Sequence, residues 1–212
     1  MTADRGHTDR GRKDQLLDAA LAEFVENGYA AVGVKEITAR AGVSHGTFYN
    51  YFDNRRQLLT VLVEREFADL LAVFDDAFAD LHKPCTEEGL RTSMETATRE
   101  LLELVQQRPE VLSFILIDVP GVDQEGLEGQ IEIFREAGRR AGEFFRQAVV
   151  DGLADPELNL EFAGQAWVSY LLSITGPVLV DDQQVDDIPR TAEIIVDFLL
   201  HGSPKQVELL RD

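Results

Sequence analysis

Apolar residues recur along this chain at intervals of three and four positions, which is the spacing of amphipathic helices. The first such segment spans residues 12–27, where Leu16, Ala20 and Phe24 share one face. Gly28 follows directly and is a typical helix stop signal. The pattern therefore predicts an amphipathic helix that ends just before Gly28.

Two more helices are predicted in the first third of the chain. A short helix is expected from Val34 to Ala41, with a glycine before it where serine or threonine would cap more strongly. Asn54 can cap a long helix that begins near Arg55, because apolar residues keep helical spacing for several turns after it. Pro84 is expected to end that long helix.

The rest of the chain repeats the same periodicity. Helical patterns cover residues 86–107, 110–118, 126–152, 158–176 and 189–201. The breaks are expected at Arg108-Pro109, Pro120-Gly121, Asp155-Pro156, Gly176-Pro177 and Ile188-Pro189. The acidic segment 181–187 is predicted to be a solvated loop. No run of alternating polar and apolar residues indicates a strand, so the predicted fold class is all-α.

The segment AGVSHGTFYNYF, residues 41–52, has the signals of two helices joined by a tight turn. Gly42 suits the left-handed backbone of such a turn. Ser44 is a favourable N-cap for a helix that begins at His45. One helix thus ends and another begins within a few residues, which predicts a helix-turn-helix.

The second helix of this motif has two unlike sides. With helical geometry through the segment, Phe48 and Phe52 share a packed side, and Gly46, Thr47 and Asn50 lie opposite. Glycine weakens a helix by roughly 1 kcal/mol relative to alanine, so its presence here indicates a close approach to a partner. The major groove of DNA, about 12 Å wide, admits a helix of this kind.

The distribution of charge changes what the net charge of −19 implies. A strongly acidic chain is a poor partner for nucleic acid, because lysine and arginine supply most of the affinity for phosphates. Residues 1–65, however, hold nine Lys and Arg against nine Asp and Glu, whereas residues 66–212 hold eleven against thirty. The neutral first part can therefore still present a basic face to DNA.

Composition indicates a cytoplasmic location. Cys85 is alone, so the chain can form no internal disulfide. No apolar run approaches the roughly 20 residues that span a bilayer. The polar N-terminus lacks the apolar stretch of a secretory signal and is predicted to be a loose basic arm.

The stretch from Gly28 and Tyr29 through VKEITARAGVSHGTFYNYFDNRRQLL, residues 34–59, resembles the DNA-binding domain of TetR-family transcriptional regulators. The resemblance covers roughly residues 12–65. It implies an N-terminal arm and three-helix DNA-binding domain over residues 1–54, and a larger helical ligand-binding and dimerisation domain over residues 55–212. The whole would be a ligand-responsive repressor that acts as a homodimer on a palindromic operator in double-stranded DNA.

Matching positions in the motif supply the candidate DNA contacts. They are Lys35, Ser44, His45, Thr47, Tyr49, Asn50, Tyr51 and Arg55. His45 and Asn50 are the expected base readers, and the hydroxyls of Thr47 and Tyr51 are expected at phosphates. For Tyr49, a ring packed on the first helix is an equal alternative. The sequence departs from the family at Gly33, Thr38 and Arg55, where a capping Ser or Thr, a small Ala and a Lys are common.

Two apolar stripes near the C-terminus are candidates for a dimer interface, because tight binding by one small motif needs two copies. Its predicted members are Phe162, Ala166, Trp167, Ile195, Val196 and Leu199. The alternative is that these stripes face only the core of their own chain.

The central helices supply candidates for a small-molecule effector site. They are Phe114, Ile117, Asp118, Phe134, Phe144, Phe145 and Tyr170, each of which can equally be a core residue. Four further residues, Arg135, Arg139, Arg140 and Arg146, can together hold an anionic ligand, with a solvated helix face as the alternative.

No sequence pattern indicates an enzyme. The chain has no HExxH, no GxSxG, no GxxxxGK[ST] and no paired cysteine, so neither a cofactor nor a metal is expected. The alternatives to a regulator are a helical enzyme, or a protein-interaction module whose helix-turn-helix does not read DNA.

Overall fold

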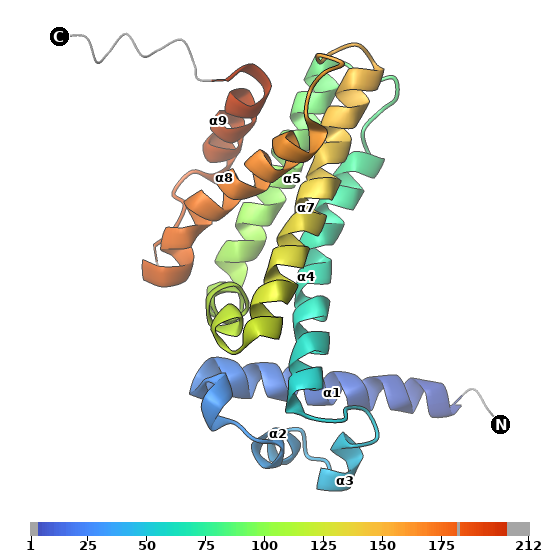
Figure 1. The fold of residues 1–212 in the computed structure, drawn as a ribbon, viewed down its shortest axis with the longest axis vertical. Coiled ribbons are helices and arrows are strands. Elements are labelled where there is room, and N and C mark those ends of the chain that lie inside the picture. The colour runs from blue at the N-terminus through green and yellow to red at the C-terminus, as the bar shows by residue number, and fades with distance from the viewer. Residues whose placement is uncertain (1–3, 182, 203–212) are drawn as a thin grey trace. The chain divides into compact units, whose positions relative to one another are not determined.

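The computed structural model describes residues 4–181 and 183–202, with side chains from residue 11 onward. Every regular element in these ranges is a helix, which confirms the predicted all-α class (Figure 1). The chain divides into two compact units. Unit 1 consists of residues 1–67 and 110–128, and unit 2 of residues 68–109 and 129–212. The boundary expected between residues 54 and 55 therefore falls inside unit 1.

Unit 1 contains the predicted helix-turn-helix and a second, distant segment. Its elements are α1 (Asp4–Asn27), η1 (Tyr29–Ala31), α2 (Val34–Arg40), α3 (His45–Phe48), the start of α4 (Arg55–Ala79), α6 (Pro109–Ser113), η2 (Phe114–Asp118), η3 (Val119–Gly121) and the start of α7 (Gln124–Val150). Asn54 caps α4 as expected, since its Oδ1 accepts from the backbone N–H of Gln57 at 2.9 Å.

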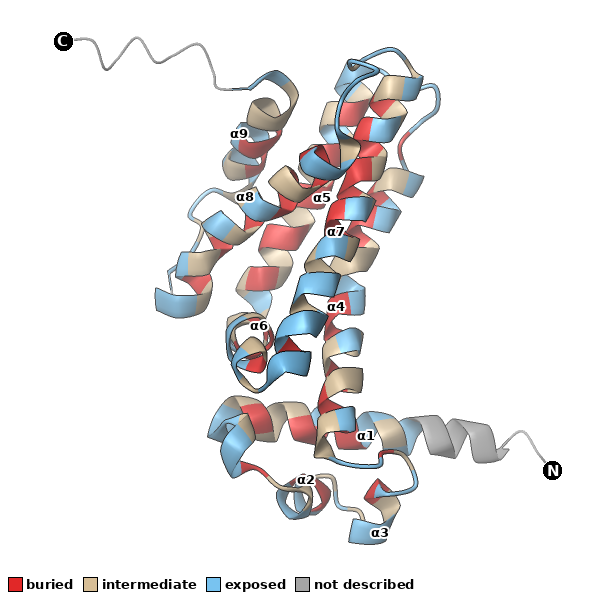
Figure 2. Cartoon of the chain, viewed as in Figure 1, coloured by how far each residue is buried: buried red, intermediate tan, exposed pale blue. Residues whose placement is uncertain are grey.

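Unit 2 contains the remainder of α4 and α7 together with α5 (Glu87–Gln107), α8 (Leu160–Asp181) and α9 (Ile188–His201). In this unit α5 packs beside both α8 and α9 (Figure 1). Buried positions recur along α5 and α7 between exposed ones, which is the expected amphipathic pattern (Figure 2). Thr86 and Asp187 cap α5 and α9.

Three predicted helix limits need correction. Helix α1 begins at Asp4, so the helix extends through most of the predicted loose arm. Helix α4 ends at Ala79, before Pro84. The helix predicted over residues 110–118 becomes π-helical from Phe114, where the N–H of Val119 bonds the carbonyl of Phe114. Pro120 follows and has no N–H, so a regular helix cannot continue through it.

The break predicted at Gly176-Pro177 is wrong, because α8 continues through Pro177 to Asp181. Thr175 and Val178, on either side of the proline, are both buried in unit 2. The hydroxyl of Thr175 also donates to the carbonyl of Leu171 at 2.9 Å. Tertiary packing thus outweighs the local tendency of proline to end a helix.

The core of unit 2 is built around Trp167, which has no exposed surface. Its indole N–H donates to the hydroxyl of Thr98 at 3.0 Å, so the only polar atom of the ring is satisfied. The rings of Phe74, Phe144 and Phe145 stand edge-on to it, with centroids 5.3, 5.3 and 6.3 Å away. This aromatic cluster joins α4, α5, α7 and α8 within the unit.

Helices α7 and α8 approach each other at three glycines. A Cβ atom on Gly164 would lie 2.0 Å from the carbonyl oxygen of Gly138 and 2.8 Å from the amide nitrogen of Gly142. Those distances are too short for any non-bonded contact, so a side chain at Gly164 would force the two helices apart.

Among the described helices, α8 alone is long and apolar enough by length and composition to cross a bilayer. Its apolar residues, however, include the buried Trp167, Val168 and Leu171 of the unit 2 core. The close crossing with α7 also leaves no room for lipid along that side. Packing within the protein therefore explains part of the composition of α8, of whose apolar window 33% is buried.

Cys85 is buried at the start of unit 2. Its backbone N–H donates to Oδ2 of Asp151 at 2.8 Å. Burial, followed by the neighbouring Asp151 carboxylate, raises the pKa of the Cys85 thiol to about 11. The thiolate, which is the reactive form, is therefore scarce near neutral pH.

We expect Cys85 to react with the thiol reagent DTNB at pH 8 at least about 100-fold more slowly in the native protein than in denaturant, where an ordinary cysteine pKa near 8.5 is restored. The absorbance of the released thionitrobenzoate measures both rates. Similar rates in the two states would show that the thiol is accessible and ionised in the native protein.

Candidate nucleic-acid interface and ligand cavity

The turn between α2 and α3 has the geometry that the sequence predicted. Gly42 adopts φ of 66°, in the left-handed region that glycine tolerates. Ser44 is extended, and its Oγ accepts from the backbone N–H of Thr47 at 3.1 Å as the N-cap of α3. The hydroxyls of Ser44 and Thr47 also lie 2.8 Å apart, within hydrogen-bonding distance. The helix-turn-helix is thus confirmed.

Helix α3 is shorter than the expected one, because it ends at Phe48. The N–H groups of Asn50 and Tyr51 bond the carbonyls of Thr47 and Phe48, three residues back, which tightens the chain into a turn. Phe52 nevertheless points inward with Phe48, and their ring centroids lie 5.6 Å apart. The predicted packed side therefore holds, although its last residue lies beyond the helix.

The polar side of the motif is exposed. Ser44, His45, Gly46 and Asn50 are all exposed at one end of unit 1. The Tyr49 ring is 53% exposed and stands edge-on to His45 and Phe48, with centroids 5.4 and 5.3 Å away. Lys35 of α2 is also exposed, whereas Thr47 and Tyr51 are half-buried.

Arg55 makes an internal contact that the sequence did not predict. Its Nη1 donates to the carbonyl of Tyr29 at 2.7 Å and to the carbonyl of Val32. The guanidinium also lies 4.0 Å from the centroid of the Tyr29 ring. Arg55 therefore fixes η1 to the start of α4, and it is the weakest of the eight candidates for DNA contact.

The two other departures from the family pattern are locally compensated. Gly33 has no side chain to cap α2, but Oε2 of Glu36 accepts from the Gly33 N–H at 3.0 Å. Hydrogen bonds from two backbone N–H groups, first that of Glu36 itself and then that of Gly33, lower the pKa of the Glu36 carboxyl group. Thr38 is buried, and its hydroxyl donates to the carbonyl of Val34 at 2.9 Å.

Most of the arginines near the motif are paired within unit 1. Arg40 bonds Glu26 through both terminal nitrogens, at 2.5 and 2.6 Å, and Glu23 at 3.2 Å. Arg65 pairs with Asp18 and Glu66, and Arg56 with Asp123. Among the described side chains of unit 1, the basic face is therefore thinner than the count of cations suggests, and α2 exposes Lys35 and the paired Arg40 there.

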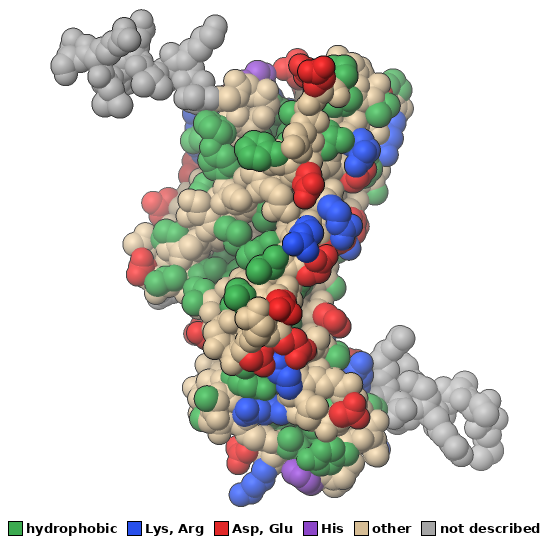
Figure 3. All heavy atoms as spheres, viewed as in Figure 1, with side chains coloured by type: hydrophobic (Ala, Val, Ile, Leu, Met, Phe, Trp, Pro, Cys, Tyr) green, Lys and Arg blue, Asp and Glu red, His purple; other side chains and the backbone are tan. Residues whose placement is uncertain are grey.

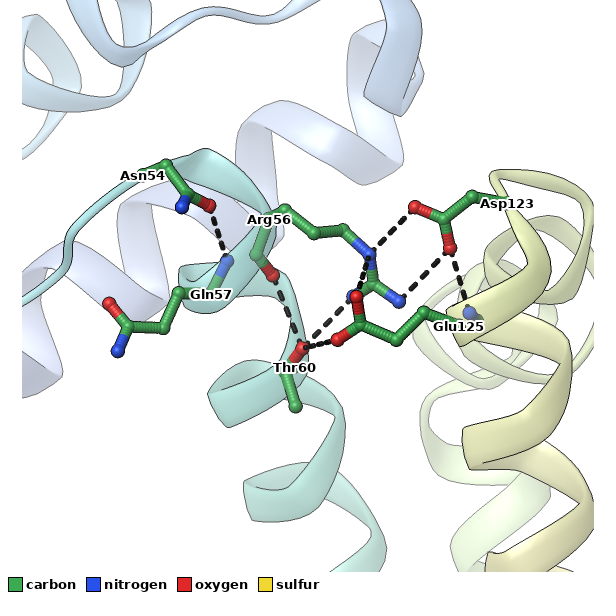
Figure 4. Close-up of polar contacts among 7 residues, drawn as sticks. Asn54, Arg56, Gln57, Thr60, Asp123 and Glu125 are labelled. Atoms are coloured by element: carbon green, nitrogen blue, oxygen red, sulfur yellow. Dashed lines mark hydrogen bonds and ion pairs between the residues drawn. The ribbon is translucent and has the colours of Figure 1, made fainter.

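Arg56 connects α4 to the distant segment of unit 1 (Figure 4). Its Nε and Nη2 donate to the two carboxylate oxygens of Asp123 at 2.8 and 3.1 Å, a two-point fork. Glu125 lies beside them and accepts from the hydroxyl of Thr60 at 3.3 Å. The Arg56 hydrogen bonds, and then the backbone N–H of Gly126, hold the pKa of Asp123 below its usual value.

A second contact anchors the same segment. The rings of Phe24 in α1 and Phe114 in η2 are stacked, with centroids 5.8 Å apart. Sequence reasoning missed both contacts, because the partners lie 67 and 90 positions apart and no local pattern relates them. Phe114 is accordingly buried in unit 1, whereas Ile117 and Asp118, also effector candidates, are exposed there.

A cavity of about 640 Å³ lies in unit 2 between the ends of α7 and α9 and the start of α8. Of the effector candidates, Phe145 and Tyr170 line it. Phe144 belongs to the closed core, and Phe134 is packed half-buried against that core. The structure therefore does not bring the seven predicted ligand residues together in one site.

The predicted dimer residues also divide into two groups. Trp167, Ile195 and Val196 are at most 2% exposed and pack in the core of their own chain, as the alternative interpretation held. This corrects their assignment to a surface that another chain contacts. Phe162 is 72% exposed and lines the cavity with Ala166 and Leu199. Within the described residues, no group of three or more His, Cys, Asp or Glu side chains is placed to hold a metal.

Comparison with known proteins agrees with this geometry. Residues 16–62 match the family model of bacterial regulatory proteins of the tetR family. The chain is 32% identical over 120 residues to an uncharacterized HTH-type transcriptional regulator of Mycobacterium tuberculosis. That alignment covers 57% of this chain and 56% of the relative, so the likeness spans little more than half of either protein.

Solved structures share the fold over about nine-tenths of the chain. FadR from Bacillus subtilis, in complex with stearoyl-CoA, superposes with a TM-score of 0.72 at 19% identity over 90% of this chain and 98% of that one. SmeT of Stenotrophomonas maltophilia, in complex with triclosan, gives a TM-score of 0.72 at 25% identity over 90% of each chain. Both likenesses extend well beyond the helix-turn-helix.

Replacing Arg55 tests its internal role. We expect Arg55→Gln to lower the free energy of unfolding by about 1–3 kcal/mol, because two backbone carbonyls lose a charged donor. Urea unfolding measures the change, and Lys35→Gln, at an exposed position of α2, is the matched control, with an expected change within about 0.5 kcal/mol. Full stability of Arg55→Gln together with weakened DNA binding would assign Arg55 to DNA instead.

The Arg56–Asp123 pair should make stability depend on pH. The folded pKa of Asp123 is depressed, so the pair stabilises the protein above the ordinary Asp pKa of about 3.9 and is lost as pH falls through the lower folded pKa. We expect Arg56→Gln to lower stability by up to about 1 kcal/mol at pH 7, since the carboxylate is 40% exposed. The difference from the wild type should vanish near pH 2.

Thermal unfolding of both proteins across this pH range measures the difference. Asp123→Asn is the matched variant, and the double variant should be no less stable than either single one. A wild-type advantage that persists undiminished at low pH would refute the assignment of this stability to the ion pair.

Proposed function

Since this chain is a member of the TetR family of bacterial regulatory proteins, we propose that it is a sequence-specific DNA-binding repressor that acts in the cytoplasm and that a small molecule releases from its operator. One observation carries the proposal. The burial of Phe48 and Phe52 turns a short polar edge, from Ser44 to Asn50, toward solvent at the end of unit 1. The exposed Gly46 leaves room for a partner to approach closely, and the exposed Tyr49 offers it an aromatic ring.

The residues of this edge divide into two roles. His45 and Asn50 are the base readers, because both are exposed and asparagine can bond adenine through two hydrogen bonds. The hydroxyls of Thr47 and Tyr51 bind phosphates and position the edge in the groove. Lys35 adds a phosphate contact from α2. Ser44 acts mainly as the cap that sets the direction of α3.

One such edge makes too few contacts for tight binding, so the active form is a homodimer on a palindromic operator. The face proposed for dimerisation lies on α8 and α9, where apolar side chains remain exposed. Phe162, Val180 and Ile194 are 72%, 68% and 54% exposed. An apolar surface of this kind is typical of a protein interface.

The proposed effector site is the cavity of about 640 Å³ in unit 2, whose lining includes Phe145, Phe162 and Tyr170. Its volume and aromatic walls are those of a site for a drug-sized apolar molecule. FadR and SmeT, which share the fold, bind stearoyl-CoA and triclosan. Both are small molecules with an apolar body, which supports the same class of effector here.

Helices α4 and α7 each begin in unit 1 and continue into unit 2, so the chain offers two continuous helical routes between the operator site and the effector site. Arg56 ties the first turns of these two helices together within unit 1. Effector binding would change the separation of the two reading edges in the dimer. Linkage then requires that an effector weakens operator binding by the same factor by which the operator weakens effector binding.

Selection of binding duplexes from a random DNA pool tests the function. We expect a palindromic winner whose affinity falls steeply with salt, because phosphate contacts release counterions. With that duplex, Thr47→Ala should weaken binding of all sequences. Asn50→Ala should mainly relax the preference at one base position of each half-site, by about 1–3 kcal/mol.

Electrophoretic mobility shifts of the winner and of its single-base variants measure these effects. An unchanged base preference in Asn50→Ala would refute its role as a reader. If no duplex is enriched even at low salt, the helix-turn-helix does not read DNA, and a protein-interaction module or a helical enzyme becomes the explanation of the fold.

A further inference from the structure

A groove in unit 2 gathers four arginines in a chain whose net charge is −19. It has a volume of about 400 Å³ and lies along α7 beside the first two residues of α8. The arginines are Arg135, Arg139, Arg140 and Arg146. Lys and Arg side chains gather over α7 on the face shown in Figure 3.

The spacing along α7 explains why a groove exists here. Arg135, Arg139, Gly142 and Arg146 follow at intervals of four, three and four, so they share one face of the helix. Gly142 stands in the middle of that row and has no side chain to fill the space. A Cβ atom there would lie 3.1 Å from the carbonyl oxygen of Leu160, so the start of α8 also depends on this glycine.

The arginines keep hydrogen-bond donors free on the open side. Among the described residues, Arg146 uses only its Nε, which bonds Glu143 at 3.1 Å, and Arg139 uses only its Nη2, which bonds Glu136. Their side chains are 58% and 60% exposed. Each guanidinium carries five N–H groups in a fixed fork, so most of the donors of both remain available.

Arg140 differs from the other three. Its side chain is 29% exposed, and it is held from two sides by Glu136 and Asp75. It therefore forms a fixed wall of the groove, whereas Arg139 and Arg146 can move toward a ligand. Arg146 pairs with the exposed Glu143, and such a surface pair contributes only about 0–1 kcal/mol, so a stronger anion can displace that glutamate. Arg139 pairs with Glu136, which is 25% exposed and also holds Arg140, so an anion competes with Glu136 for Arg139.

We propose that this groove binds a small molecule that carries a diphosphate group. Arginine forks match phosphate oxygens in a two-point geometry, and four arginines line the groove. Each of them also pairs with a carboxylate, from Glu132, Glu136, Asp75 or Glu143, with which the anion must compete. Arg139 and Arg146 are seven residues apart, or about 10 Å along the helix axis. Two linked phosphates can bridge that separation over Gly142, whereas a single phosphate engages one guanidinium well.

The binding itself does not depend on DNA recognition. A diphosphate bound beside α8 would add to the contacts that an effector makes in unit 2. Any effect of the diphosphate on DNA binding therefore rests on the proposed function, whereas its binding to the groove does not. The test therefore measures diphosphate binding and DNA binding separately.

Isothermal titration calorimetry of the full chain with inorganic pyrophosphate, at low ionic strength and without divalent metal, measures the site directly. We expect one pyrophosphate per chain, and binding of inorganic phosphate weaker by about tenfold or more. The double variant Arg139→Gln, Arg146→Gln should weaken pyrophosphate binding by about tenfold or more. Arg190→Gln, which removes a 65% exposed arginine paired with Glu193 on α9, is the matched control and should bind like the wild type.

A second double variant, Arg139→Lys with Arg146→Lys, separates geometry from charge. It keeps both positive charges but loses the forks, so we expect it to lose part of the affinity for pyrophosphate. Circular dichroism and thermal unfolding establish that each variant is folded. In the absence of pyrophosphate, the glutamine double variant should bind the selected DNA duplex as the wild type does, so failure of the groove is distinguishable from failure of the proposed function.

Three results would overturn the proposal. The first is the absence of pyrophosphate binding to the wild type at millimolar concentration and low salt. The second is equal affinity in the wild type and the glutamine double variant, which would place any binding elsewhere on the chain. ADP, titrated in the same way, shows whether the groove accepts a diphosphate that is attached to a nucleoside. The third result is that pyrophosphate binds and ADP does not, which would limit the site to the free anion and overturn the assignment to a larger ligand.

Discussion

Unit 2 depends on the close approach of the backbones of α7 and α8, where a Cβ atom on Gly164 would lie 2.0 Å from the carbonyl oxygen of Gly138. Because the two helices meet so closely, Trp167 of α8 reaches the aromatic rings of α7 and α4 and donates to Thr98 of α5. The same approach brings the start of α8 beside the end of α7, which bounds both the effector cavity and the arginine groove. Both proposed ligand sites of unit 2 are thus consequences of one close helix crossing.

Unit 1 follows a different principle, in which the buried side of a short segment decides what its other side presents. Phe48 and Phe52 are buried, and the N-cap of Ser44 fixes where α3 begins. The remaining side chains of that turn of helix therefore face solvent, where a partner can contact them. Four residues of helix are enough for this purpose, since what matters to a DNA groove is the position of a few polar groups and not the length of the helix that carries them.

The sequence predicted what local chemistry controls. Capping by Ser44 and Asn54, the turn at Gly42 and the inward direction of Phe48 each follow from a few neighbouring residues, and the structure confirms them. It could not predict contacts that depend on the path of the chain. The fork between Arg56 and Asp123 joins residues 67 positions apart. The burial of Trp167 could not be predicted either, because an apolar helical stripe is equally compatible with a core and with an interface. The same limit explains why the predicted effector residues scatter over two units, because aromatic composition identifies apolar helices and not the cavity that they enclose.

Both proposals ask an acidic protein to bind an anion, and screening shows why this is physically reasonable. At physiological salt, charges separated by more than about 8 Å interact weakly through solvent. The acidic surface of residues 66–212 therefore costs little at an edge of unit 1 that carries Lys35 and hydroxyl groups, whereas in the groove an anion competes with the carboxylates that pair with the four arginines. What the net charge does impose is selectivity. Anions are repelled near the acidic surface, so they collect where several donors converge. Most arginines among the described residues near the helix-turn-helix are already paired, so DNA affinity depends on two copies acting together.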